Sequence, residues 1–156
     1  MLSISPLDML YQLLAENRTA VLKLNPTAAP LVDVYRAMFT PLTDRGLVEI
    51  VTGGPEMGAL AGHPGIAAVH MTGSEATHDA VVWGTGEPAT AAKTAGTPEL
   101  SKPMTSELGG VSPIIVLPGE WSDADLHYQA EHVATMRLHN SGCNCIAGQI
   151  LILSSD

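Results

Sequence analysis

The sequence has few aromatic residues, few cysteines and little positive charge. Aromatic residues make up only 4 % of its 156 residues, so the core must consist mainly of Val, Leu, Ile, Ala and Met. Two cysteines with one residue between them do not make a disulfide framework, and we expect a reducing, cytoplasmic location. Only 7 lysines and arginines oppose 16 acidic residues, which argues against a nucleic-acid or anionic-membrane partner.

Long hydrophobic runs are also absent. No stretch of ~18 apolar residues exists, so we expect no transmembrane helix. The N-terminal segment lacks a cationic region and contains Pro6 and Asp8, which makes it a poor signal peptide. The 46 % hydrophobic content, however, argues for a folded chain with its own core.

Helical and strand-like segments alternate along the first part of the chain. Helices are expected at residues 8–17, 30–46, 54–64 and from 74 onward, with strands at 19–24, 47–53 and 67–73. This order predicts an α/β fold with a three-layer, Rossmann-like parallel sheet. We assign residues 1–106 to this domain, with 84–102 as a flexible loop rich in Gly, Ala, Thr and Pro.

A second α/β domain is expected to begin at residue 107 and to continue to residue 156. It contains the apolar run "SPIIVLP", a helix capped by Ser122, and the final strand "QILILSS". The sequence shows no partner for this last strand, whose open edge would be prone to aggregation. We therefore expect the chain to be part of something larger.

Three segments place a potential ligand contact directly after a strand. Lys23 ends "VLKL", glycines open the turn "GGPEMG", and Ser74 opens a helix after "MTG". Ligands bind at the carboxyl edge of open α/β sheets, and helix N-termini favour anions. We therefore expect Lys23, Gly54, Gly58 and Ser74 to lie at the carboxyl edge of one parallel sheet. Each segment also has an ordinary explanation: a solvated lysine, a structural turn and a helix cap.

The two cysteines lie in "NSGCNCIAGQ", a turn bracketed by glycines. A disulfide or metal site, a pair of buried small hydrophobes and a reactive thiol are the alternatives. A zinc site needs about four ligands, and the histidines at 127, 132 and 139 do not share one helix face. A thiol just after a helix fits an exposed nucleophile better.

Together, five motifs in this order resemble those of the aldehyde dehydrogenase superfamily, from about Thr19 to the end of the chain. They are "VLKLNP", "GGPEMG" followed by "HP", "HMTGSEATH", "TSELGGVSPIIV" and "NSGCNCIAGQ". The resemblance implies a Rossmann-like NAD(P) domain joined to a catalytic domain that carries a cysteine nucleophile.

The resemblance also assigns catalytic roles. The family's Asn-x-Gly-x-x-Cys pattern falls on Asn140, Gly142 and Cys145, which makes Cys145 the expected nucleophile. The family's general base in "ELGG" falls on Glu107, so we expect Glu107 and Cys145 to face one cavity. The thiolate would attack an aldehyde carbonyl, and water would hydrolyse the thioester that remains after hydride transfer.

Contacts to NAD or NADP are implied at the three post-strand segments, and no metal is implied. The residues concerned are Lys23 for the adenosine ribose, Gly54 and Gly58 for the pyrophosphate helix, and Thr72, Gly73 and Ser74 in the "TGS" turn. Pro26 stands where the family often has a Glu that binds the ribose hydroxyls, so NADP is not repelled.

The resemblance therefore implies oxidation of an aldehyde to a carboxylic acid by an enzyme that is a homo-oligomer at full length. We expect this chain to be a central fragment that is weakly active or inactive alone. No Asn stands near residues 3–5, where the family has a second oxyanion donor. A CoA-acylating enzyme and a non-catalytic nucleotide-binding or interaction module are the alternatives.

Overall fold

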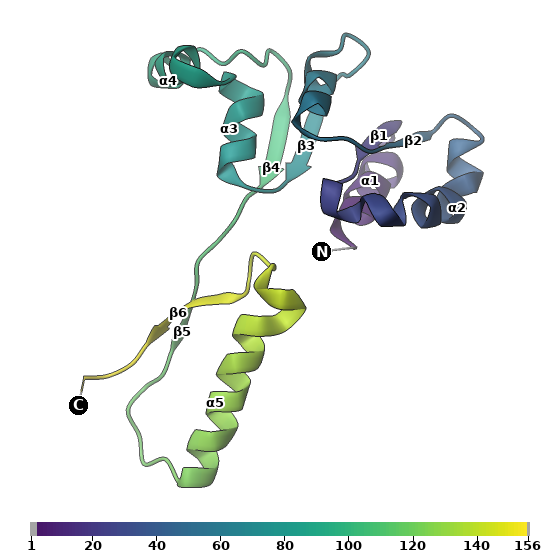
Figure 1. Ribbon diagram of the computed structural model, residues 1–156. Helices are drawn as coiled ribbons and strands as arrows, with labels where there is room; N and C mark the ends of the chain where they lie inside the picture. Colours follow the sequence, from purple (N-terminus) through teal and green to yellow (C-terminus); the bar gives the residue numbers. More distant parts are fainter. Residues whose placement is uncertain (1–2, 156) are drawn as a thin grey trace. The chain divides into compact units, whose positions relative to one another are not determined.

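The computed structural model describes residues 3–155 and divides the chain into two compact units (Figure 1). Among the described residues, the N-terminal unit comprises 3–107, and the C-terminal unit begins at Leu108. Each unit is described by itself. No helix in the described part of the chain is long and apolar enough to cross a membrane.

The N-terminal unit alternates helices with short strands. Its elements are α1 (Ile4–Leu14), β1 (Ala20–Lys23), η1 (Pro26–Leu31), α2 (Val32–Thr43), β2 (Val48–Val51), η2 (Pro55–Gly62), β3 (Val69–Thr72), α3 (Glu75–Trp83), α4 (Gly86–Ala95) and β4 (Met104–Glu107), where η denotes a 3₁₀ helix. α2 continues through Pro41 without a break.

The strands of this unit form two parallel pairs. β1 pairs with β2 from Ala20↔Val48 onward, and β3 pairs with β4 from Val69↔Met104 onward. The predicted α/β class with parallel strands is confirmed, but the prediction of one continuous sheet is wrong. β3 pairs with β4, a strand that the sequence analysis did not predict. Hydrophobic pattern indicates a strand but does not select its partner, because pairing joins residues that are distant in sequence.

The core of the N-terminal unit lies around the β1–β2 pair. Strand β2 buries alternate residues, Val48 and Ile50, and β1 contributes Leu22. α1 adds Met9 to this core, and α2 adds two aromatic residues. Helices therefore cover the aliphatic strands, as expected for an α/β unit. The buried aromatics are Tyr35 and Phe39.

The expected loop at 84–102 is instead largely helical. Residues 86–95 form α4, because alanine has the highest helix propensity and this segment contains four alanines. Gly96 ends the helix in the left-handed conformation (φ 67°), and its N–H bonds to the carbonyls of Ala92 and Lys93. Sparse apolar content misled the sequence analysis, although alanine and a terminal glycine were both present.

The C-terminal unit is a strand–helix–strand arrangement. It comprises β5 (Ser112–Ile115), α5 (Asp123–Leu138), the short 3₁₀ helix η3 (His139–Gly142) and β6 (Gly148–Ile152). β5 and β6 are parallel, so the expectation that the last strand has no partner is wrong. The connection through α5 supplies the long crossover that parallel strands require.

α5 begins with the predicted cap. Ser122 Oγ accepts a hydrogen bond from the Asp125 N–H at 3.2 Å, and Asp125 Oδ2 accepts one from the Ser122 N–H at 3.1 Å. Hydrogen bonds from the Ser122 hydroxyl and then from its backbone N–H lower the pKa of Asp125. The cap therefore fixes the start of the helix that leads to the cysteines.

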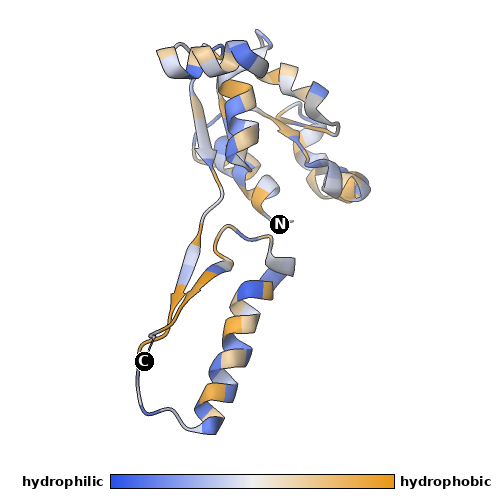
Figure 2. Cartoon of the chain, turned by 60° about the vertical axis from the view of Figure 1, so that its left-hand side comes forward, coloured by the Kyte–Doolittle hydropathy of each residue, from blue (hydrophilic) through white to orange (hydrophobic). Residues whose placement is uncertain are grey.

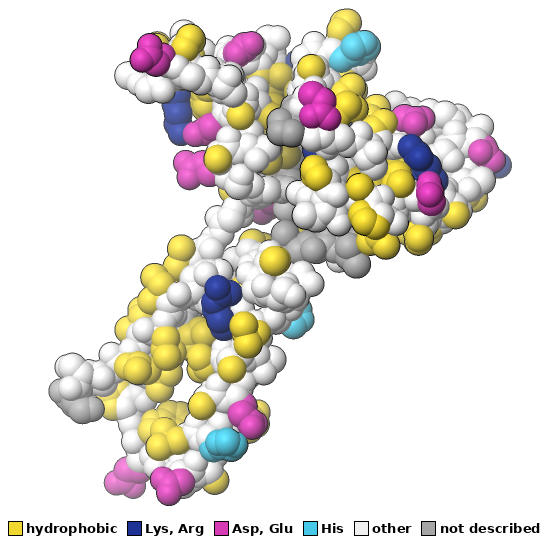
Figure 3. Space-filling view, viewed as in Figure 1, with side chains coloured by type: hydrophobic (Ala, Val, Ile, Leu, Met, Phe, Trp, Pro, Cys, Tyr) yellow, Lys and Arg dark blue, Asp and Glu magenta, His cyan; other side chains and the backbone are white. Residues whose placement is uncertain are grey.

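Hydrophobic residues of β5 and β6 remain only partly covered. Figure 2 shows them along both strands, and Figure 3 shows hydrophobic side chains gathered on this unit. Ile115 of β5 is 62 % exposed and Ile150 of β6 is 50 % exposed. A single helix is too small to bury both faces of a parallel strand pair.

Candidate active site

Cys145 lies in the turn between η3 and β6. Three consecutive residues before it, Asn140, Ser141 and Gly142, have positive φ angles of 52°, 58° and 71°. Left-handed backbone is costly for residues other than glycine, and asparagine tolerates it better than most. The sequence "NSG" therefore suits the sharp change of direction that ends the helical segment.

A side-chain network holds this turn. Asn140 Nδ2 donates to Asn144 Oδ1 at 3.1 Å, and Asn144 Nδ2 lies 2.7 Å from His139 Nδ1. The Ala147 N–H donates to the Asn144 carbonyl at 3.0 Å. Asn144 is the residue between the two cysteines, so the network fixes the backbone on both sides of it.

The two thiols differ in their surroundings. Both are free and exposed, so neither the disulfide alternative nor the buried-hydrophobe alternative describes them. Cys143 Sγ lies 3.7 Å from the Ser141 carbonyl, to which it donates. Across residues 3–155 the structure records no hydrogen bond to the Cys145 thiol. Those residues also contain no group of three or more His, Cys, Asp or Glu that could hold a metal ion.

Gly110 brings a second segment against the Cys145 backbone. A Cβ atom at this position would lie 3.1 Å from the Cys145 carbonyl oxygen, closer than an ordinary van der Waals contact. Glycine thus allows the "GG" of "ELGG" to approach the turn that carries Cys145.

Glu107 is the last residue of β4 and is exposed. Its carbonyl accepts a hydrogen bond from the Gly73 N–H at 3.0 Å, and in the β3–β4 register it lies opposite Thr72. Its carboxylate has no recorded hydrogen bond or ion pair within the described residues. Glu107 and Cys145 belong to different units, so their meeting in one cavity stays a prediction.

Lys23 and Gly54 lie at the carboxyl ends of β1 and β2. The Gly54 N–H donates to Glu56 Oε1 at 2.6 Å, so a carboxylate already occupies the turn predicted to bind an anion. The pKa of Glu56 is lowered, chiefly by its own backbone N–H and by that of Gly54, with a smaller contribution from the charge of Lys23. Gly58 is exposed, with nothing near its Cα that would demand a glycine.

Thr72, Gly73 and Ser74 lie at the carboxyl end of β3. Ser74 Oγ accepts the Thr77 N–H at 3.2 Å, so it caps α3, and Thr72 Oγ1 donates to Asp8 Oδ2 at 3.0 Å. The predicted cofactor residues therefore divide between two strand pairs instead of sharing one sheet edge. The single-edge prediction is wrong because β2 and β3 are not hydrogen-bonded to each other.

Comparison with known proteins identifies the family of this chain. The model of the aldehyde dehydrogenase family matches residues 3–156. The chain belongs to the aldehyde dehydrogenase family. A chloroplastic aminoaldehyde dehydrogenase of Arabidopsis thaliana is 36 % identical over 148 residues, and so is a chloroplastic betaine aldehyde dehydrogenase of Amaranthus hypochondriacus. Each match covers 91 % of this chain and 25 % of the relative, so the chain spans about a quarter of their length.

Solved aldehyde dehydrogenases share the fold of this segment. A substrate-bound Staphylococcus aureus enzyme is 25 % identical with a TM-score of 0.62, over 88 % of this chain and 26 % of that one. A Pseudomonas syringae enzyme complexed with NAD+ and octanal is 28 % identical with a TM-score of 0.58, over the same shares.

One polar cluster of this aldehyde dehydrogenase segment was not predicted from the sequence. Asp8, His70, Thr72 and Thr105 join α1, β3 and β4 through side-chain contacts. A histidine inside a strand was the available signal, but its partners lie 35 and 62 residues away. Such contacts cannot be found from spacing along one element.

Proposed function

We propose that this chain forms part of an NAD(P)-dependent enzyme that oxidises an aldehyde to a carboxylic acid, with Cys145 as nucleophile and Glu107 as general base. The observation that carries the proposal is the exposed Cys145 thiol, unpartnered among residues 3–155, in a turn built from three left-handed residues. Such a turn presents a thiol to a substrate instead of burying it.

Chain connectivity supports the pairing with Glu107. Gly110, which lies against the Cys145 carbonyl, follows Glu107 after two residues. Three residues of chain span at most about 11 Å, so the backbone of Glu107 is tethered near the backbone of Gly110. A glutamate carboxylate is a suitable general base for a thiol or a water molecule.

The chemistry follows from these groups. Glu107 takes the proton of the Cys145 thiol and passes it to solvent. Cys145 Sγ forms a bond to the aldehyde carbon, while the carbonyl oxygen becomes an oxyanion that the Cys145 N–H can stabilise. Bound NAD(P) supplies the acceptor for the hydride that leaves this carbon. Glu107 takes a proton from water, the water oxygen attacks the resulting thioester, and the thiolate of Cys145 leaves.

The residues present fit such a cofactor. The Gly54 N–H already binds the carboxylate of Glu56, so this turn accommodates negative charge beside Lys23. Lys23 can contact a ribose hydroxyl, and Ser74 begins α3 with its exposed N-terminal turn. Pro26 places no carboxylate against a 2′-phosphate, so we include NADP with NAD. The proposal further includes homo-oligomerisation and a cytoplasmic location.

The test uses the protein with whatever sequence flanks residues 1–156 in its gene. We expect NAD or NADP to bind, and the Cys145→Ser variant to lose NAD(P)H production while Cys143→Ser keeps it. Binding of nucleotide without any Cys145-dependent turnover would show a non-catalytic module instead. Turnover that requires added coenzyme A would identify an acylating enzyme.

Residues 1–156 expressed alone should show little or no turnover. The relatives are about four times longer, so much of the substrate pocket is expected outside this segment. Loss of a single oxyanion donor costs on the order of 10²–10³ in rate. Robust, Cys145-dependent turnover by this segment alone would contradict the fragment prediction.

A further inference from the structure

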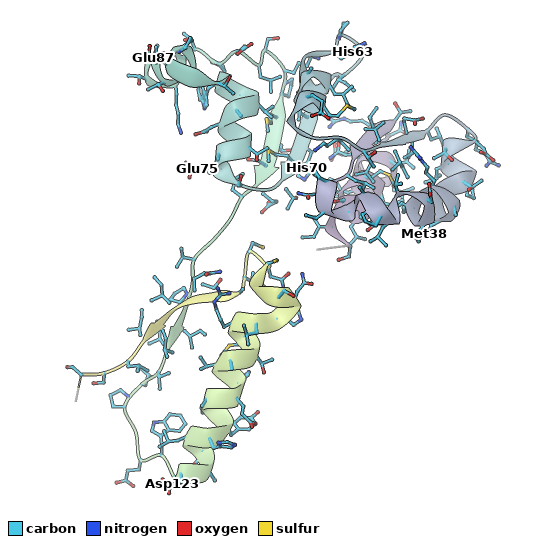
Figure 4. All side chains as sticks on the ribbon, in the orientation of Figure 1. Met38, His63, His70, Glu75, Glu87 and Asp123 are labelled. Atoms are coloured by element: carbon cyan, nitrogen blue, oxygen red, sulfur yellow. The ribbon has the colours of Figure 1, made fainter. Side chains whose placement is uncertain are left out.

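A chain of polar side chains, half-buried at Asp8, His70 and Thr72 and exposed at Thr105, joins three elements of the N-terminal unit. Asp8 of α1 accepts a hydrogen bond from Thr72 Oγ1 at 3.0 Å, and the same Oδ2 atom lies 3.5 Å from His70 Nε2. On its other side, His70 Nδ1 lies 2.8 Å from Thr105 Oγ1. Figure 4 labels His70, which lies on the α1 side of β3.

The chemistry of the partners orients this chain. A carboxylate only accepts hydrogen bonds, so a hydrogen on His70 Nε2 suits the Asp8 oxygen that lies 3.5 Å from it. In the neutral ring Nδ1 then accepts, and the Thr105 hydroxyl donates to it. Thr105 is thereby linked to Asp8 through the His70 ring.

The strand register puts Glu107, the expected general base, on the same face of the β3–β4 pair as His70, Thr72 and Thr105. In the β3–β4 pair His70 lies opposite Thr105, and Thr72 lies opposite Glu107. Side chains of residues i and i+2 share one face of a strand, so all four side chains line one face of the pair. Three of the four belong to the polar chain, and the fourth, Glu107, has no recorded partner in the described residues.

We propose that Asp8, His70 and Thr105 are positioning residues for Glu107. By tying the Glu107-bearing face of β4 to α1, they limit the positions that the carboxylate samples and hold it ready for proton abstraction. The inference rests on the proposed function, because it assumes that Glu107 is the base. A general base contributes about 10²–10⁴-fold to rate, so partial misplacement should remove a measurable share.

Hydrolysis of a p-nitrophenyl ester tests the proposal without any cofactor. The ester acylates Cys145 and releases p-nitrophenolate as a burst, and the steady rate then reports the attack of water on the thioester. The variants are Thr105→Val, which removes the hydroxyl at similar volume, Thr105→Ser, which restores it, and Glu107→Gln. All are compared by melting temperature in the protein with its natural flanking sequence.

We expect Thr105→Val, like Glu107→Gln, to slow the steady rate of ester hydrolysis, by about tenfold or more. Thr105→Ser should recover most of this steady rate. In the Glu107→Gln background Thr105→Val should have no further effect, because a positioning residue acts through the group it positions. Asp8→Asn should likewise slow the steady rate in the wild-type protein and have no further effect in Glu107→Gln. It serves as the second variant if Thr105→Val does not fold.

The positioning role alone would be overturned if Thr105→Val reduced the steady rate by the same factor in the wild-type protein and in Glu107→Gln. Full activity of both Thr105→Val and Asp8→Asn would also overturn it. A Cys145→Ser variant that keeps the burst, or a Glu107→Gln variant at the wild-type rate, would overturn the proposed function and this inference with it. The two failures are therefore distinguishable in one data set.

Discussion

The turn that carries Cys145 depends on glycine at position 142. Gly142 has φ 71°, a conformation that an L-residue adopts at a cost of roughly 1–2 kcal/mol. A Cβ atom there would also lie 3.2 Å from the Arg137 carbonyl oxygen and against the Arg137 guanidinium. The guanidinium can move away, but the backbone carbonyl cannot do so without shifting the end of α5.

We therefore expect Gly142→Ala to lower the free energy of unfolding of the C-terminal unit by about 1–2 kcal/mol. Gly109→Ala is the matched control, because nothing lies within 4 Å of a Cβ at that position and its φ is not positive. The control should be neutral or slightly stabilising, since it restricts the unfolded chain. Urea denaturation gives both values, and the alkylation rate of Cys145 reports whether the turn has changed.

If Gly142→Ala were as stable as the control, and Cys145 were alkylated at an unchanged rate, the left-handed turn would not be the conformation in solution. Cys145 would then not be presented by this turn.

Three further changes test other parts of the structure. Gly110→Ala should alter the alkylation rate of Cys145, because its methyl group would crowd the Cys145 carbonyl; an unchanged rate would contradict that contact. Leu24→Ala, at a position only 1 % exposed, should cost about 2–5 kcal/mol in urea denaturation, and a smaller loss would show that the core lies elsewhere. Lys93→Met should raise the pKa of Asp79, which the Lys93 hydrogen bond at 2.5 Å holds below its ordinary 3.8. A depressed carboxyl pKa stabilises the fold above 3.8 and ceases to do so as the pH falls through the folded-state value, so carboxyl NMR and acid unfolding should show this pH dependence diminished in the variant.

Local sequence signals predicted individual elements well. The cap at Ser122 and the cap at Ser74 stand where polar side chains precede helical segments, and both are observed. The segments predicted as strands at 47–53 and 149–155 overlap β2 and β6, and β5 lies in the apolar run "SPIIVLP". These features depend on neighbours within a few residues, so one sequence is enough to find them.

Pairing and packing were harder to predict. The strand ending at Glu107 was not predicted because "MTSE" contains few apolar residues. This strand pairs with β3, so the N-terminal unit has two strand pairs in place of the single predicted sheet. The last strand was expected to be unpaired, but it pairs with β5. The residues of "QILIL" indicate a strand and do not indicate which strand it pairs with. Non-local contacts depend on how the whole chain folds back, which periodicity does not encode.

The candidate site shows the same division. Motif order selected Cys145 and Glu107 as candidates, and the structure adds that Cys143 donates to the Ser141 carbonyl while Cys145 has no recorded partner within residues 3–155. The chain from Asp8 through His70 joins residues up to 64 positions apart. Only a three-dimensional structure could bring these groups together.

The central claim is that Cys145 is the residue that becomes acylated by the substrate. The direct measurement is mass spectrometry of the protein, in its natural flanking sequence and with Glu107→Gln, after incubation with an aldehyde and NAD+ or NADP+. We expect a covalent acyl adduct that survives in Cys143→Ser, disappears in Cys145→Ser, and is assigned to Cys145 by fragmentation. An adduct retained in Cys145→Ser, or carried by Cys143, would contradict the account.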